Sequence, residues 1–117
     1  MLDKNHPLFI KSTTLSETAY VEGWALYCEN LGEYESLESL YGKLNMELTR
    51  AIRLVLDTGL HYYGWSFQKC LNYYKKYSLY EVEEMKTHIF RYLANPGQAL
   101  TYKMGEKVFL DLRKKYK

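Results

Sequence analysis

One acidic residue interrupts an apolar and aromatic segment of the sequence. Glu22 stands within the stretch Tyr20–Tyr27, and helical geometry places it on one face with Ala19 and Leu26. A carboxylate on an apolar face is costly unless it is paired or bound to a metal. Two interpretations stay open from the residues alone. Glu22 is either a metal ligand or a boundary residue that reaches solvent or pairs with an arginine of another helix.

A second set of polar residues recurs at helical spacing. Arg50, Arg53, Asp57 and His61 follow one another at steps of three and four residues, so the pairs Arg53–Asp57 and Asp57–His61 could each touch. An Asp beside a His can orient the imidazole ring and fix its tautomer, as catalytic and metal-binding histidines often require. The alternative is a charged helix face turned toward solvent, with ordinary ion pairs along it.

The third candidate is the segment 91–102, which reads as a junction between two helices. Gln98 and Tyr102 are four residues apart and would face together. A tyrosine hydroxyl near a polarised carbonyl group can stabilise a developing oxyanion. The alternative is a capped turn between helices, with tyrosines that pack against the core.

Helical periodicity runs through the whole sequence and predicts the elements that hold these residues. Thr14–Glu17 and Ser78–Glu81 resemble capping boxes, Ser36 or Ser39 and Ser66 are candidate N-caps, and Gly32 and Gly64 are candidate helix stops. Asn95–Pro96 should end one helix and begin the next. Residues 1–13 look irregular. We therefore expect five helices, at about 14–31, 36–63, 66–77, 78–94 and 96–115.

The longest of these helices carries a pronounced apolar stripe. Its members recur every three or four residues and should face the core: Leu37, Leu40, Tyr41, Leu44, Leu48, Ala51, Ile52 and Val55. No segment alternates polar and apolar residues for long enough to predict a strand. The sequence predicts an all-α protein in which residues 1–117 form a single helical domain or fragment.

Composition restricts the class of function. The chain has 117 residues, a length that fits one domain, and a net charge of +2. A charge this small does not favour nucleic acid or an anionic membrane as the partner. No apolar run approaches the ~20 residues of a membrane span. The first residues do not resemble a secretory signal, so we expect a cytoplasmic or undetermined compartment and reduced thiols at Cys28 and Cys70.

Four blocks of sequence together resemble one family. They are residues 20–29 (YVEGWALYCE), 47–61 (ELTRAIRLVLDTGLH), 64–66 (GWS) and 91–105 (RYLANPGQALTYKMG). In this order they resemble the C-terminal portion of the domain of unknown function 885 family, whose members look like zinc metallopeptidases of the gluzincin type. The resemblance extends over nearly the whole chain from Leu8 onward. It implies that the helices are the C-terminal part of a larger gluzincin-like α-helical fold.

The resemblance also implies roles for the residues singled out above. In a gluzincin, an HExxH helix supplies two histidine ligands and a general-base glutamate, and a later helix supplies a third, carboxylate ligand. Glu22 matches the position of that third zinc ligand. His61 and Tyr102 match positions that would face the reacting carbonyl group as catalytic residues. Asp57, Arg91 and Gln98 would support them or position the substrate.

The sequence departs from the family pattern because it contains no HExxH. A catalytic zinc needs about three protein ligands. We therefore expect that the chain alone binds no zinc and hydrolyses no peptide, and that an N-terminal chain bearing HExxH could complement it. The alternative is a non-catalytic all-α remnant or binding module. If the helices normally pack against another half, they should expose apolar surface and could form homo-oligomers.

Overall fold

The computed structural model describes residues 18–116, which form an all-α fold without a strand. Five α-helices and one short 3-10 helix follow one another: α2 (Thr18–Glu29), α3 (Leu37–His61), α4 (Phe67–Tyr77), α5 (Val82–Ala94), η1 (Gln98–Leu100) and α6 (Thr101–Lys115). The predicted fold class is confirmed. The irregular segment 1–13 and the capping box at 14–17 lie outside the described residues.

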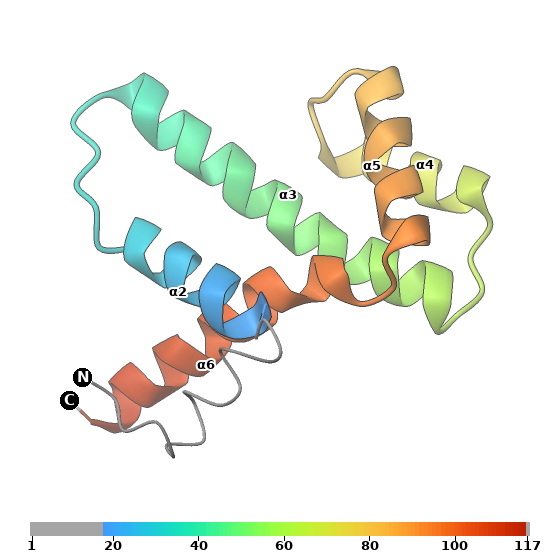
Figure 1. The fold of residues 1–117 in the computed structure, drawn as a ribbon. Coiled ribbons are helices and arrows are strands. Elements are labelled where there is room, and N and C mark those ends of the chain that lie inside the picture. Colours follow the sequence, from blue (N-terminus) through green and yellow to red (C-terminus); the bar gives the residue numbers. More distant parts are fainter. Residues whose placement is uncertain (1–17, 117) are drawn as a thin grey trace, which may run out of the picture.

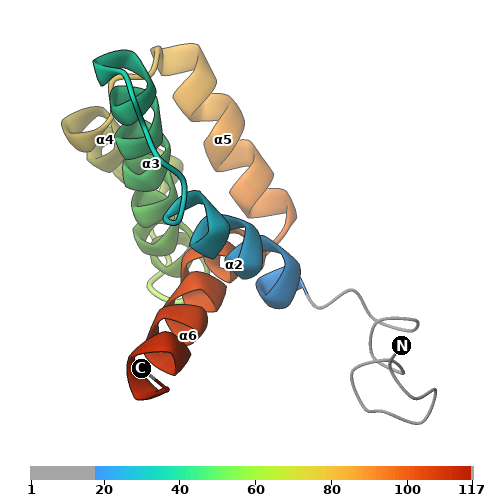
Figure 2. The ribbon, with the colours of Figure 1, turned by 90° about the vertical axis from the view of Figure 1, so that its left-hand side faces the viewer.

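Helix α3 is the central element of the molecule (Figure 1). Helices α4 and α5 pack on one another and on α3, and η1 lies against α3. Helices α2 and α6 pack extensively on each other and form a second group. The view in Figure 2 shows α2 lying across α6, away from α4. The fold thus consists of two groups of helices that α3 and the α5–α6 connection hold together.

The core lies in the group built by α3, α4, α5 and η1. Its fully buried members are mostly apolar: Ile52, Leu56, Cys70, Leu71, Tyr74, Met85, Ile89, Tyr92 and Ala99. Trp65, Phe67 and Tyr80 are partly buried and pack against this cluster. The core therefore fixes the second half of α3, which carries Asp57 and His61.

Several helix ends follow the sequence signals. Ser36 caps α3, because its hydroxyl accepts a hydrogen bond from the Ser39 N–H while the Ser39 hydroxyl accepts one from the Ser36 N–H. Ser66 caps α4 through the Lys69 N–H. Gly64 follows α3 at φ +63, a backbone conformation that favours glycine. The predicted caps at the start of α3 and α4 are therefore confirmed, whereas α3 ends at His61 with Tyr62 as its C-cap, before Gly64.

Three predicted helix ends are wrong. The fourth helix begins at Val82 and not at Ser78, because Ser78 still donates its N–H to Tyr74 as the C-cap of α4. Gly32 does not adopt a positive φ, since α2 has already ended at Glu29. Asn95 does end α5, but a turn and η1 come before α6. These errors concern connections whose geometry is set by packing on neighbouring helices.

The predicted apolar stripe of α3 is mostly not buried, contrary to prediction. Of its eight members only Ile52 lies in the core, whereas Leu37, Leu44 and Leu48 are 81%, 55% and 41% exposed. The first half of α3 meets α6 through a charged side chain, because Glu47 binds Lys103. The molecule thus exposes a contiguous run of apolar side chains on its longest helix.

Glycines allow α2 and α6 to approach closely. Gly105 packs against Ala19 and Gly23, and a Cβ atom added at Gly105 would overlap the Ala19 carbonyl oxygen. Phe109 closes the same contact on one side, with its ring 5.7 Å from the ring of Tyr20 and 5.2 Å from that of Trp24. The segment that carries Glu22 is thereby fixed against α6.

Candidate functional site at the junction of α3, α5 and α6

Asp57 holds the turn between α5 and η1 in place. Its side chain is 2% exposed, and its two carboxylate oxygens lie 3.1 and 3.2 Å from the Gly97 backbone nitrogen. Gly97 has φ +79 and directly precedes η1, so the carboxylate accepts a hydrogen bond at the positive end of a helical turn. The family block around Asp57 is thus joined to the block around Gln98.

His61 lies at the end of α3 and reaches the end of α5. Its Nε2 atom is 3.0 Å from the backbone oxygen of Tyr92. Because a carbonyl oxygen can only accept, Nε2 carries the proton in this hydrogen bond. The imidazole is exposed and has Nδ1 left for another partner. In the neutral ring, Nδ1 is then a hydrogen-bond acceptor.

The hydroxyl of Tyr102 is surrounded by donors. Arg91 Nη2 and Gln98 Nε2 each lie 3.4 Å from it, and Arg91 Nη2 also donates to Gln98 Oε1 at 3.0 Å. With its oxygen accepting, the hydroxyl proton of Tyr102 can point outward. The prediction that Gln98 and Tyr102 face together is confirmed. The geometry leaves Tyr102 as a hydrogen-bond donor, which is what stabilisation of an oxyanion requires.

The predicted pairs along α3 do not form. Asp57 binds Gly97 and His61 binds Tyr92, so neither an Arg53–Asp57 ion pair nor an Asp57–His61 hydrogen bond occurs in the described chain. The solvent-face alternative is also wrong for the middle of the stripe, because Arg53 and Asp57 are buried. Tertiary partners on α5 and η1 replace the local ones.

Behind the junction lies a buried polar cluster that the sequence pattern did not predict. Tyr74 and His88 share a hydrogen bond of 2.7 Å, and the hydroxyl of Tyr92 is buried without a hydrogen-bond partner in the described residues. Burial lowers the pKa of His88, and the Arg53 guanidinium lowers it further. Burial raises the pKa of Tyr92 against the opposing effect of Arg53. The positive charge of Arg53 therefore influences buried side chains of the group formed by α3, α4 and α5.

The tyrosines near the end of α3 and in α4 lie in different surroundings. Tyr74 is fully buried in the core, whereas Tyr62 and Tyr63 are exposed and stack edge to face on each other. They do not form one surface.

Glu22 makes no hydrogen bond or ion pair with the described residues of the junction. It is half-buried on α2 and forms no ion pair with another described residue. Glu22 and Glu29 are seven residues apart and share a helix face, and Glu29 binds Arg50 of α3, so this face is turned toward α3. Glu22 could supply one zinc ligand. However, residues 18–116 contain no group of three or more His, Cys, Asp or Glu side chains that could hold a metal.

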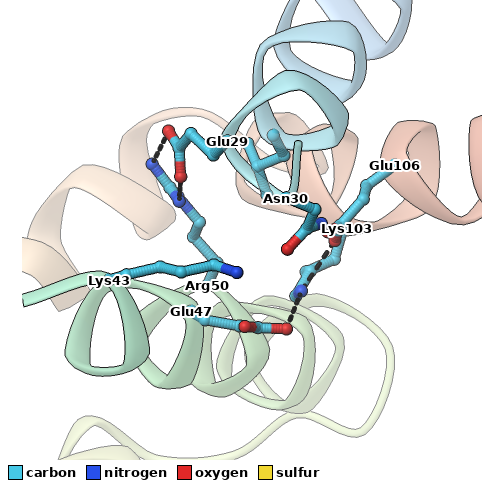
Figure 3. A pocket seen from close by; sticks show the side chains of 8 residues that line it. Glu29, Asn30, Lys43, Glu47, Arg50, Lys103 and Glu106 are labelled. Carbon is cyan, nitrogen blue, oxygen red and sulfur yellow. Dashed lines mark hydrogen bonds and ion pairs between the residues drawn. The ribbon is translucent and has the colours of Figure 1, made fainter. Parts of the chain in front are cut away.

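Ion pairs between α2, α3 and α6 surround a small charged pocket and hold these helices together (Figure 3). Glu29 binds Arg50 at 2.5 and 2.9 Å, and Lys103 binds Glu47 at 3.0 Å and the buried Glu106 at 2.6 Å. Burial disfavours the charged form of Lys103, but its hydrogen bonds to Glu106 and Glu47 outweigh burial and raise the pKa of the ammonium group. Each of these carboxylates already has a cationic partner, so the pocket offers no free ligand for a metal.

Cys28 is exposed and Cys70 is buried, and both are free thiols. Among the described helices, none has the length and apolar character needed to cross a membrane.

The fold and the site define an all-α protein in which two sequence blocks, 47–61 and 91–105, meet at one helix junction. The chain belongs to the family described as "Bacterial protein of unknown function (DUF885)", which it matches over residues 2–117. The family resemblance of the sequence blocks is thereby confirmed. No curated protein and no solved structure matches the chain.

Proposed function

We propose that this chain is the C-terminal helical part of a zinc metallopeptidase-like protein. It would supply one carboxylate ligand and the groups that contact the substrate, while an HExxH helix outside residues 1–117 would supply the remaining ligands. The observation that supports the proposal is the convergence at one junction of Asp57, His61, Arg91, Gln98 and Tyr102. These residues come from blocks up to 45 positions apart in the sequence.

The residues of this chain fit only part of a zinc site. Glu22 is a half-buried carboxylate without an ion-pair partner among residues 18–116, as one ligand requires. A catalytic zinc needs about three protein ligands, and the described chain gathers no such group. Zinc, once bound by both parts, would polarise the carbonyl group of the substrate. The proposed activity therefore depends on a second segment.

The roles of the junction residues follow from their hydrogen bonds. Tyr102 would donate to the oxygen that becomes negative, and Arg91 would hold the hydroxyl in place while adding positive charge. His61 would act as a hydrogen-bond acceptor through Nδ1. Asp57 would not contact substrate, because both its oxygens face the Gly97 N–H.

The proposal is tested by complementation. The chain is combined with an N-terminal segment of a family member that carries HExxH, and hydrolysis of a fluorogenic peptide is measured with and without zinc. We expect zinc-dependent hydrolysis that Glu22→Gln abolishes and that Glu33→Gln, at an exposed position between α2 and α3, leaves intact. Activity that persists in Glu22→Gln would contradict the assignment of Glu22.

The second candidate is a non-catalytic helical remnant that acts through binding. The exposed apolar stripe of α3 favours it, because such surfaces often mark contacts with other proteins. This candidate predicts that zinc changes the melting temperature of neither the chain nor its Glu22→Ala variant, whether or not a complementing segment is present. A zinc-dependent rise that requires Glu22 would exclude it.

A further inference from the structure

Arg53 is a buried cation without an acidic partner. Its side chain comes from α3 and is 9% exposed, and its Nε atom is buried without a hydrogen-bond partner. No carboxylate of the described residues lies within ion-pair distance of its guanidinium. Asp57, one helical turn further along α3, is occupied by Gly97. Buried charges are normally paired, so Arg53 lacks the group that would compensate it.

Arg53 lies against the ring of Tyr102 and near the buried hydroxyl of Tyr92. The Arg53 guanidinium carbon lies 5.1 Å from the centre of the Tyr102 ring, in a cation–π contact. On another side of the same tyrosine, Arg91 reaches the hydroxyl at 3.4 Å. Arg91 also has no carboxylate within ion-pair distance among residues 18–116. Two guanidinium groups from α3 and α5 therefore flank one side chain of α6, and neither is neutralised.

The hydrogen-bond donors around Tyr102 exceed the acceptors. Arg53 Nε is unpaired, Arg91 offers further N–H groups, and the Tyr102 proton has no acceptor in the described chain. Gln98 adds an amide that already donates to Tyr102 and accepts from Arg91. Burial has the largest effect on the pKa of His88, which it lowers. The charges of Arg53 and Arg91 lower it further, and Glu84 raises it. Such a set of donors is suited to an anionic oxygen ligand.

We propose that Arg53 and Arg91, which flank Tyr102, bind a carboxylate group, and that its source is the free C-terminal carboxylate of a peptide. The planar guanidinium matches a carboxylate in a paired hydrogen-bond geometry. The neutral Gln98 amide beside it suits a peptide bond next to the carboxylate. The identity of the ligand as a peptide rests on the proposed function, whereas the binding of an anion by this chain does not.

The test uses the chain alone, without zinc or a complementing segment. An N-acetylated dipeptide with a free carboxylate is titrated against the protein, and the side-chain Nε–H signal of Arg53 is followed by NMR. We expect a saturable shift with the free acid and none with the same dipeptide as its C-terminal amide. The Arg91→Gln variant, changed at an exposed position, should weaken binding about tenfold, the equivalent of ~1.4 kcal/mol.

Matched variants keep the test decisive. Arg113 also stacks on a tyrosine ring, at 5.8 Å from Tyr27, and reaches its hydroxyl at 3.3 Å, but it is exposed at the far end of α6. Arg113→Gln should leave binding unchanged. Arg53→Met should abolish binding, as followed by backbone amide signals. If Arg53→Met fails to fold, the weaker binding of Arg91→Gln, compared with that of Arg113→Gln, decides between the site and its absence.

Several results would overturn the proposal. One is an equal response to the acid and the amide, and another is binding that Arg91→Gln leaves intact. If inorganic phosphate binds more tightly than the dipeptide, the ligand is a phosphate group and not a peptide carboxylate. These failures differ from failure of the proposed function, because loss of zinc-dependent hydrolysis in the complemented protein would not affect carboxylate binding by the chain alone.

Discussion

Single residues at the junction make contacts that local sequence patterns do not predict. The i,i+4 spacing of Arg53, Asp57 and His61 predicts contacts within α3. In the fold, Asp57 binds Gly97 and His61 binds Tyr92, so residues 31 and 40 positions away take the place of helix neighbours. A charge-assisted hydrogen bond to a buried N–H is stronger than an exposed ion pair along a helix, which explains why the tertiary contact prevails.

Asp57→Ala should destabilise the protein by about 1.5–3 kcal/mol. The substitution removes a hydrogen bond to a charged acceptor and leaves the Gly97 N–H, partly buried, without a partner. Urea denaturation followed by circular dichroism measures the loss. Asp57→Asn, which retains one acceptor oxygen, should lose less. If both variants unfold at the same urea concentration as the parent chain, Asp57 does not hold this turn.

His88 should make stability depend on pH just below neutrality. Burial and the charge of Arg53 lower its pKa from the ordinary value of 6.5. As pH falls below about 6.5, the unfolded chain therefore takes up the proton before the folded one, and the free energy of unfolding decreases. Denaturation curves between about pH 7 and 5 should show this decrease, and His88→Gln should show less of it. An identical pH dependence in the variant would assign the effect to another group.

At the scale of elements, sequence signals predicted helices well and connections less well. Ser36 and Ser66 act as caps because their hydroxyl groups reach N–H groups within the next turn. Ser78 has the same signal, but its hydroxyl accepts from Tyr80 in a turn, because Tyr80 packs against the core. Residue spacing predicts a helix cap when the cap depends only on residues of the next turn. It does not predict where a helix begins when that depends on the packing of a residue such as Tyr80 against distant parts of the chain.

The glycine contact between α2 and α6 gives a direct test of element packing. Gly105→Ala would place a methyl group against the Ala19 carbonyl, where backbone and not a flexible side chain must move. We expect a loss of about 1–3 kcal/mol in the free energy of unfolding. Gly42→Ala is the matched control, since Gly42 lies inside α3 with nothing within 4 Å of an added Cβ atom. It should stabilise the protein by about 0.5–1 kcal/mol. Equal effects of the two changes would argue against close packing of α2 on α6.

At the scale of the whole molecule, the exposed apolar surface is the main feature. The pattern of α3 predicted one continuous core-facing stripe, and of its eight members only Ile52 lies in the core. Periodicity indicates which side of a helix is apolar, but it cannot indicate whether another element is present to cover it. We propose that a second copy of the chain covers the first half when no partner segment is present.

Leu44→Glu tests this proposal for the isolated chain. Leu44 is 55% exposed and lies outside the core, so the variant should keep its stability within about 0.5 kcal/mol. Its self-association, measured by analytical ultracentrifugation over a range of concentrations, should fall. Asn72→Glu on α4 adds the same charge at another exposed position and should leave self-association unchanged. A parent chain that is monomeric at every concentration would contradict the proposal.

The central claim is that Glu22 is one ligand of a zinc site that a second segment completes. The most direct measurement is the zinc content of the purified complex between this chain and an HExxH-bearing segment from the same family. The proposal predicts one zinc ion per complex, lost in Glu22→Gln and retained in Glu33→Gln. A complex that forms and retains zinc without the Glu22 carboxylate, or a parent complex that forms and binds none, would contradict it.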